Sequence, residues 1–256
     1  MTTHQFERIL PWQLRAELAR RPVAFIPLGT YEWHGEHLPV GLDALTSHGL
    51  CLRAAEHDGG IVLPPLYYGT GGGHGHYPWS MMMPQPHEIE AQLAFTLHKL
   101  KSFGFKLVVL FSGHFPPEQL EMIDRLAAVH GDNVMKVVAY AVNRIEGLTI
   151  GPDHAGLFET TLLAALHREF VQLDRLPSLE GRPLHPDENP FGDVRHDPDH
   201  PLYGIFGPDP RHFKEDDAAA LLNGSVNWLV AQVRQALPTS VPAPLPFAQG
   251  STHPPR

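Results

Sequence analysis

Short apolar runs alternate along this chain with longer stretches in which apolar residues recur every three to four positions. The apolar runs predict buried strands at 23–28, 61–63, 106–111 and about 134–141. The periodic stretches predict helices at 11–21, 44–57, 87–103, 117–130, from about 157 onward, and at about 214–237. Strands and helices that alternate in this way indicate a mainly parallel sheet covered by helices on both faces.

Two segments lack this periodicity. Residues 171–213 are rich in Pro, Asp and His, and we predict an irregular excursion over the surface. The Pro-rich end, 238–256, is predicted to be a tail that is either disordered or lies along a neighbouring subunit. The remaining residues, 1–237, are long enough for one full-sized core and predict a single domain.

Composition narrows the possible partners and the compartment. Apolar residues make up 43% and charged residues 18%, which is typical of a globular protein. The net charge of −9 and the lack of a basic run argue against nucleic-acid and anionic-membrane partners. No apolar run approaches the ~18 residues of a membrane span, and the first residues lack a signal-peptide pattern. The single cysteine, Cys51, excludes an intramolecular disulfide, is predicted to be a small buried residue and fits a reducing cytoplasm.

Candidate chemistry concentrates in the stretch GTYEWHGEHLPVGLD at 29–43, directly after the first predicted strand. Alternate side chains of an extended segment share a face, so Glu32 and His34 can point into one cavity. Asp43 can return to the same cavity and bridge two ions with its two carboxylate oxygens. His114 follows another predicted strand, and ligands of parallel sheets gather at the carboxyl ends of the strands. We therefore expect a metal centre at this rim.

Simpler interpretations stay open on the residues alone. Glu32 and His34 can be a solvated acid and a packed histidine. Asp43 stands where the N-cap of the helix at 44–57 belongs, and it can be a cap, a ligand or both. Glu159 lies in the first turn of a predicted helix, where an acid commonly compensates the helix dipole.

A long loop at 64–86, PPLYYGTGGGHGHYPWSMMMPQP, separates the second strand from the next helix. It is rich in Gly, aromatic and Met residues and is too long for a simple connector. We predict that it faces the substrate, with Tyr68 and Trp79 as candidate substrate contacts.

Three motifs together, at 29–43, SGH at 112–114 and DHAGLFETT at 153–161, resemble the creatininase (creatinine amidohydrolase) family. The resemblance covers about residues 5–236. It implies a three-layer α/β/α sandwich with a mainly parallel central sheet. It also implies a hydrolytic site with two divalent ions, zinc, manganese or iron, in a homo-oligomer that is commonly a hexamer.

The same resemblance implies roles for individual residues. One ion would take Glu32, Asp43 and His114, and the other would take His34, Asp43 and Glu159. His154 would be a proton shuttle, and Asp153 either orients it or is a turn residue. The loop motif GTGGGHGHYP at 69–78 implies that His74 lies near the substrate.

Two departures from the family bear on the substrate. Pro116 stands where creatininase itself has a ligand glutamate, so the second ion must rely on Glu159 or bind weakly. Leu148, Ile150 and Pro152 stand near the HAG segment, where the tryptophans that close over creatinine are absent. We therefore do not expect creatinine to be the substrate.

The expected function is metal-dependent hydrolysis of a small cyclic or formyl amide. An ion lowers the pKa of its bound water towards ~7, and histidine transfers protons near neutral pH. One alternative keeps the ions and opens the ring of a keto-polyol of the inosose type. A second alternative is a metal-binding assembly protein without catalysis.

Overall fold

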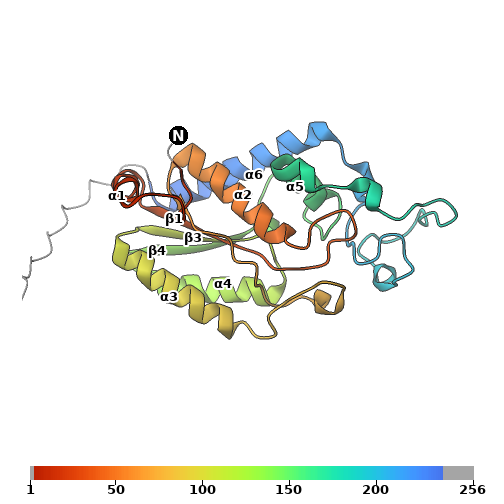
Figure 1. Ribbon diagram of the computed structural model, residues 1–256, viewed down its shortest axis with the longest axis horizontal. Coiled ribbons are helices and arrows are strands. Elements are labelled where there is room, and N and C mark those ends of the chain that lie inside the picture. Colours follow the sequence, from red (N-terminus) through yellow and green to blue (C-terminus); the bar gives the residue numbers. More distant parts are fainter. Residues whose placement is uncertain (1–2, 239–256) are drawn as a thin grey trace, which may run out of the picture.

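A four-stranded parallel sheet forms the centre of the computed structural model, which describes residues 3–238 (Figure 1). The strand order is β2-β1-β3-β4. The strands are β1 (Val23–Leu28), β2 (Ile61–Val62), β3 (Leu107–Ser112) and β4 (Lys136–Ala141). All four predicted strands are present: β1 has the predicted ends, and the ends of the others lie within two residues of the predictions.

The register aligns the carboxyl ends of the two central strands. Val23 pairs with Leu107 and Leu28 pairs with Ser112, so β1 and β3 end side by side. Every residue of β1 and β3 is buried, which explains why both strands are continuous apolar runs in the sequence. The segments that follow Leu28 and Ser112 therefore leave the sheet at the same edge.

Helices cover both faces of the sheet and complete the three-layer α/β/α sandwich (Figure 1). The helices are α1 (Pro11–Arg20), α2 (Leu42–Asp58), α3 (His87–Phe103), α4 (Pro117–His130), α5 (Leu157–His167) and α6 (Glu215–Ala236). Helices α2, α5 and α6 bury one core cluster against residues such as Phe25 and Val109. Helices α3 and α4 bury a second cluster against Ile26 and Leu110 on the opposite face. Within residues 3–238 no helix is long and apolar enough to cross a membrane.

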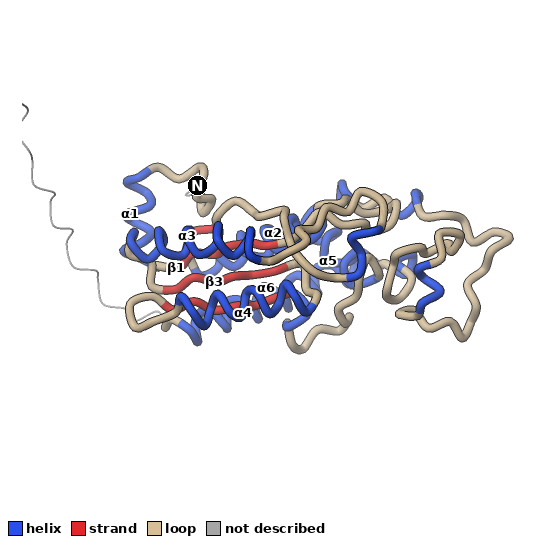
Figure 2. Tube along the Cα trace, turned by 90° about the horizontal axis from the view of Figure 1, so that it is seen from below, coloured by secondary structure: helices blue, strands red, loops and turns tan. Residues whose placement is uncertain are grey.

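The excursion at 171–213 is irregular, as predicted, but it is more than a surface segment. It contains short 3-10 turns, and its Leu202 and Ile205 are buried in a third cluster with Leu42 and Leu163. Figure 2 shows the long loops gathered at one end of the strands. The excursion therefore forms part of the rim at which the candidate site lies. The predicted tail falls almost wholly outside the described residues.

Candidate active site

The structure brings together five predicted side chains from four segments: the loop after β1, the start of α2, the residues after β3, and the first turn of α5. Two donor groups share Asp43, and the donor atoms within each lie within 4.8 Å of one another. The groups are Glu32, Asp43 and His114, and His34, Asp43 and Glu159. A third group of this kind combines Glu32, His34 and His154.

The closest contacts link imidazole nitrogens to carboxylate oxygens. His114 Nδ1 lies 3.1 Å from Glu32 Oε2 and 3.2 Å from Asp43 Oδ2. His34 Nε2 lies 3.1 Å from Asp43 Oδ1 and 3.5 Å from Glu159 Oε2. Each carboxylate oxygen of Asp43 therefore faces a different histidine, as a bridging ligand requires.

Hydrogen bonds on the far side of each ring fix its orientation. His34 Nδ1 donates to the Glu32 carbonyl at 2.9 Å, which directs Nε2 at the carboxylates of Asp43 and Glu159. His114 Nε2 donates to the Gly71 carbonyl at 3.3 Å, which leaves Nδ1 free. Metal-ligating histidines commonly hold their second nitrogen in this way.

The donor set fits a divalent metal ion. All five residues are at most 4% exposed, and His34 Nε2 and Asp43 Oδ2 have no hydrogen-bond partner. A buried carboxylate or imidazole without a partner is costly, and a cation among these groups would remove that cost. Mixed carboxylate and imidazole ligands accept zinc, manganese and iron.

The charges of the site shift its pKa values strongly. Burial opposes charge on both rings, yet Asp43 and Glu159 raise the pKa of His34 to about 10. Burial also opposes charge on His114, but Glu32 and Asp43 raise the pKa of its ring to about 10. Burial raises the pKa of Glu159 well above its usual range. The buried carboxylates of the site therefore favour positive charge on the groups and ions among them.

Two glycines allow α2 to begin inside the site. A Cβ on Gly29 would lie 2.2 Å from Ala44 N, and a Cβ on Gly113 would lie 2.1 Å from Asp43 O. The first turn of α2 therefore packs against both strand ends only because these positions lack a side chain. The predicted N-cap role of Asp43 is wrong: the helix begins at Leu42 after Gly41, without a side-chain cap, and the Asp43 carboxylate points to the histidines.

Asp153 is a turn residue that caps α5. Its carboxylate accepts hydrogen bonds from the backbone N–H groups of Gly156, Phe158 and Glu159 at 3.2, 2.9 and 3.2 Å. Ala155 has a positive φ of 57°, and its N–H donates to Glu159 Oε2 at 2.6 Å. This turn sets the direction of Glu159 and separates it from His154. The capping contacts favour the turn role of Asp153 over direct orientation of His154.

Two further histidines lie beside the donor clusters. His154 Nε2 donates to the Trp33 carbonyl at 2.9 Å, so its Nδ1 faces Glu32 Oε1 at 3.9 Å. Burial, together with the charges of neighbouring histidines, lowers the pKa of His154 to about 3 and keeps the ring neutral. His74 Nδ1 donates to Glu32 Oε1 at 2.6 Å, and its ring lies 4.3 Å from the His154 ring.

Phe206, in the excursion, holds both of these histidines. Its N–H and C=O exchange hydrogen bonds of 2.8 Å with the backbone of His154. Its ring stacks on His74 at a centroid distance of 5.1 Å and an angle of 7°. Sequence reasoning missed Phe206, although a short apolar island at 202–206 marks it within a polar segment.

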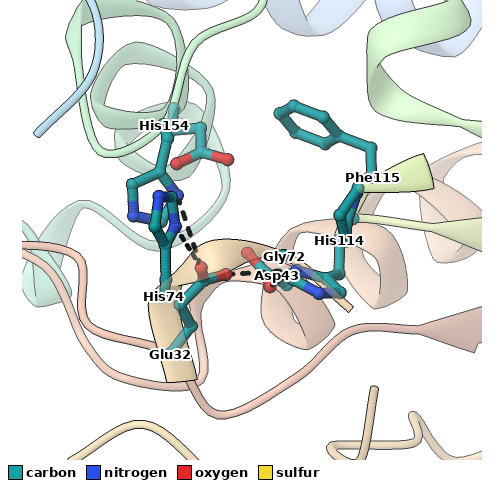
Figure 3. A pocket seen from close by; sticks show the side chains of 10 residues that line it. Glu32, Asp43, Gly72, His74, His114, Phe115 and His154 are labelled. Carbon is teal, nitrogen blue, oxygen red and sulfur yellow. Dashed lines mark hydrogen bonds and ion pairs between the residues drawn. The ribbon is translucent and has the colours of Figure 1, made fainter. Parts of the chain in front are cut away.

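A small cavity of about 140 Å³ opens above the donor clusters. Figure 3 shows Phe115 across the cavity from His74 and His154. Pro116 and Gly72 also line it. Phe115, likewise missed from sequence, directly follows the SGH motif.

The two aromatic residues predicted to contact substrate do not line this cavity. Tyr68 is 48% exposed and Trp79 is 78% exposed, with a positive φ of 61° at Trp79. Tyr68 packs edge-on against Tyr31 instead, at a ring distance of 5.9 Å. Of the loop at 64–86, Gly72 and His74 line the cavity.

Several known proteins are similar in sequence to this chain. The chain is 29% identical over 178 residues to creatinine amidohydrolase of Pseudomonas putida, covering 60% of this chain and 68% of that one. It is 26% identical over 181 residues to a mycofactocin precursor peptide peptidase of Mycolicibacterium smegmatis, covering 64% and 65%. It is 27% identical over 112 residues to 3-dehydro-scyllo-inosose hydrolase of Thermotoga maritima, covering 43% and 35%.

The same fold occurs in a solved structure of creatinine amidohydrolase, with a TM-score of 0.73 at 23% identity, covering 93% of this chain and 99% of that one. At this identity the likeness establishes the fold alone. The model of the creatininase family, described as creatinine amidohydrolase, matches residues 10–233. That match spans most of the chain, and the chain belongs to the creatininase family of hydrolases.

Proposed function

We propose that this chain is a two-metal hydrolase that cleaves the C–N bond of a small cyclic or formyl amide. The observation that carries the proposal is the pair of buried donor groups that share Asp43, with unpartnered atoms on His34 and Asp43. One ion would be held by Glu32, Asp43 and His114. The other would be held by His34, Asp43 and Glu159, so that Glu159 replaces the ligand that Pro116 cannot provide.

The residues around the ions divide the remaining work. Bound divalent ions supply an activated water, whose pKa falls towards ~7, and polarise a carbonyl. The water adds to the amide carbon, the C–N bond breaks, and the departing nitrogen takes a proton. His154 Nδ1 faces the cavity as a neutral acceptor, and it would take the proton from water and return it to that nitrogen. His74 would keep Glu32 oriented and present its free Nε2 to the substrate.

A second candidate function is hydrolytic ring opening of a keto-polyol. The similarity to the inosose hydrolase of Thermotoga maritima supports it. A metal-binding assembly protein without catalysis is a third possibility, and the complete donor set with His154 beside it favours an enzyme over this alternative. From the family resemblance we further propose a homo-oligomer, with a hexamer as the expected form, and from the single cysteine a cytoplasmic location.

Metal reconstitution tests the proposal directly. The full chain is loaded with zinc, manganese or iron, the ions per chain are counted, and cyclic and formyl amides are screened against keto-polyols. We expect two ions per chain and turnover of amides. His34→Ala and Asp43→Ala should lower the metal content, and unchanged metal content in both variants would refute the assigned ligands. If the enzyme hydrolyses keto-polyols and no amide, the amide proposal is wrong and the second function replaces it.

A further inference from the structure

We propose that Phe115 and Pro116 restrict this site to amides whose remaining part is apolar and uncharged. The inference rests on the proposed amide hydrolysis and names the class of substrate that the same cavity accepts. It excludes two classes of compound: amides with an anionic substituent, and polyhydroxylated substrates.

The cavity offers very few polar groups beyond the donor clusters. Among the described residues, none that lines it is Lys, Arg, Ser, Thr, Asn, Gln or Tyr. The lining consists of four proposed ligands, two further histidines, two glycines and the apolar pair: Glu32, Asp43, His114 and Glu159; His74 and His154; Gly72 and Gly113; Phe115 and Pro116.

Most nitrogens of the lining histidines are already engaged. His114 uses one nitrogen for Gly71 and directs the other to the carboxylates. His74 uses Nδ1 for Glu32, and His154 uses Nε2 for the Trp33 carbonyl. One nitrogen each on His74 and His154 stays free for substrate. A polyol would bring more hydroxyl groups than this, and a buried hydroxyl without a partner is unfavourable.

The charge of the lining disfavours an anionic substituent. Glu32, Asp43 and Glu159 are acids, and no lysine or arginine among residues 3–238 lines the cavity. The proposed ions attract the reacting carbonyl, but a carboxylate elsewhere on the substrate would lie against Phe115 without a cation. Burying such a charge without a partner is strongly unfavourable.

Contacts with neighbouring residues hold Phe115 and Pro116, the apolar side of the cavity, in place. Phe115 packs against the core cluster of α2, α5 and α6, so its ring does not move freely. A Cβ on Gly72 would lie 3.4 Å from Pro116 Cβ, in ordinary van der Waals contact, so the glycine backbone lies beside the proline ring. The cavity volume of about 140 Å³ suits one small ring or a short branched chain.

Three matched formamides test the inference on the metal-loaded full chain. N-isobutylformamide is apolar, N-(1,3-dihydroxypropan-2-yl)formamide carries two hydroxyls and N-formylglycine carries a carboxylate. Two hydroxyls are one more than His74 can pair while His154 serves the leaving nitrogen. We expect kcat/KM for the apolar compound to exceed the other two by about 10-fold or more. Binding of all three is also measured by calorimetry, so the order of affinity is known even without turnover.

Variants of Phe115 locate the cause. Phe115→Ala should lower kcat/KM for N-isobutylformamide about 10-fold, with little change for the other two compounds and with unchanged metal content. Phe115→Leu keeps most of the volume and should keep most of the preference, which also covers a failure of the alanine variant to fold. Phe95→Ala, at a 64% exposed position on α3, is the matched control.

The outcomes separate the two proposals. Equal or better turnover or binding of the hydroxylated or anionic compound would overturn the selectivity while the hydrolase assignment stands. The expected order of binding without hydrolysis of any amide would overturn the proposed function while the selectivity stands. A preference that persists in Phe115→Ala would overturn the role of Phe115.

Discussion

Each end of α2 has a buried carboxylate, and the two carboxylates have different surroundings. At the amino end Asp43 faces Glu32 and Glu159 among histidines, and its Oδ2 has no hydrogen-bond partner. At the carboxyl end Asp58 Oδ2 accepts from Arg21 Nε at 2.9 Å and Oδ1 accepts from Arg234 Nε at 2.6 Å. The Arg21 and Asp58 side chains are only 4% and 3% exposed.

The difference distinguishes a structural acid from a ligand. Asp58 is neutralised by Arg21 and Arg234 of the chain itself. It therefore needs no metal ion from solution to balance its charge. Asp43 gathers further acids around it, and the chain supplies neither arginine nor lysine to the cavity it lines, as far as the structure describes it. Such a cluster is stable with an added cation, which supports the proposed metal site.

The largest expected effect comes from Asp43→Asn, which keeps the shape and removes the charge. We expect loss of bound metal and a fall of about 10³-fold or more in kcat/KM. In the presence of a chelator the free energy of unfolding should fall, because the buried His34 and His114 rings lose the carboxylate that faces both of them. Metal analysis and urea unfolding measure both quantities. If the variant still binds two ions per chain, Asp43 is not a metal ligand.

The matched variant at the other end is Asp58→Asn. It leaves the buried Arg21 without its full counter-charge and should lower the free energy of unfolding by ~3 kcal/mol. The metal content should not change. Urea unfolding of the metal-loaded protein tests this, and a variant that loses metal but not stability would reverse the assignment of the two ends.

Metal affinity should rise with pH. The pKa values of His34 and His114 are raised to about 10 by the surrounding carboxylates despite burial, so both rings carry protons at neutral pH before a metal binds. Binding must displace these protons, and each one displaced lowers the apparent affinity by about 10-fold per unit fall in pH. Chelator competition between pH 6 and 8 measures the slope. A flat profile would show that the two imidazoles are not ligands.

The smallest effect is expected at Phe206, which contacts the histidines and not the proposed ions. Phe206→Ala removes the stack on His74, and we expect kcat to fall about 5-fold, since an aromatic pair contributes ~1 kcal/mol. Metal content should not change, and Phe206→Tyr should restore kcat. Phe191→Ala, at a 56% exposed position in the same excursion, is the control. A loss of metal in Phe206→Ala would mean that the excursion supports the ligands as well.

The sequence by itself determined the layers and the rim of the sheet. Continuous apolar runs such as 23–28, too short for a helix, predict strands buried on both faces, and periodic stretches such as 87–103 predict helices with one buried face. Since the carboxyl ends of parallel strands meet at one edge, Glu32 and His114 were expected to converge, and the structure places them 3.1 Å apart.

Only the tertiary structure decided which role each nearby side chain has. Asp43 is not a helix cap, because Gly29 and Gly113 let the backbone of α2 approach both strands and turn its carboxylate inward. Tyr68 and Trp79 lie outside the cavity although their loop lines it, and Phe206 reaches His74 from more than a hundred residues away. Local periodicity in the sequence indicates which residues are buried. It does not show which backbone segments approach closely or which distant groups form hydrogen bonds, because these contacts form only when the chain packs.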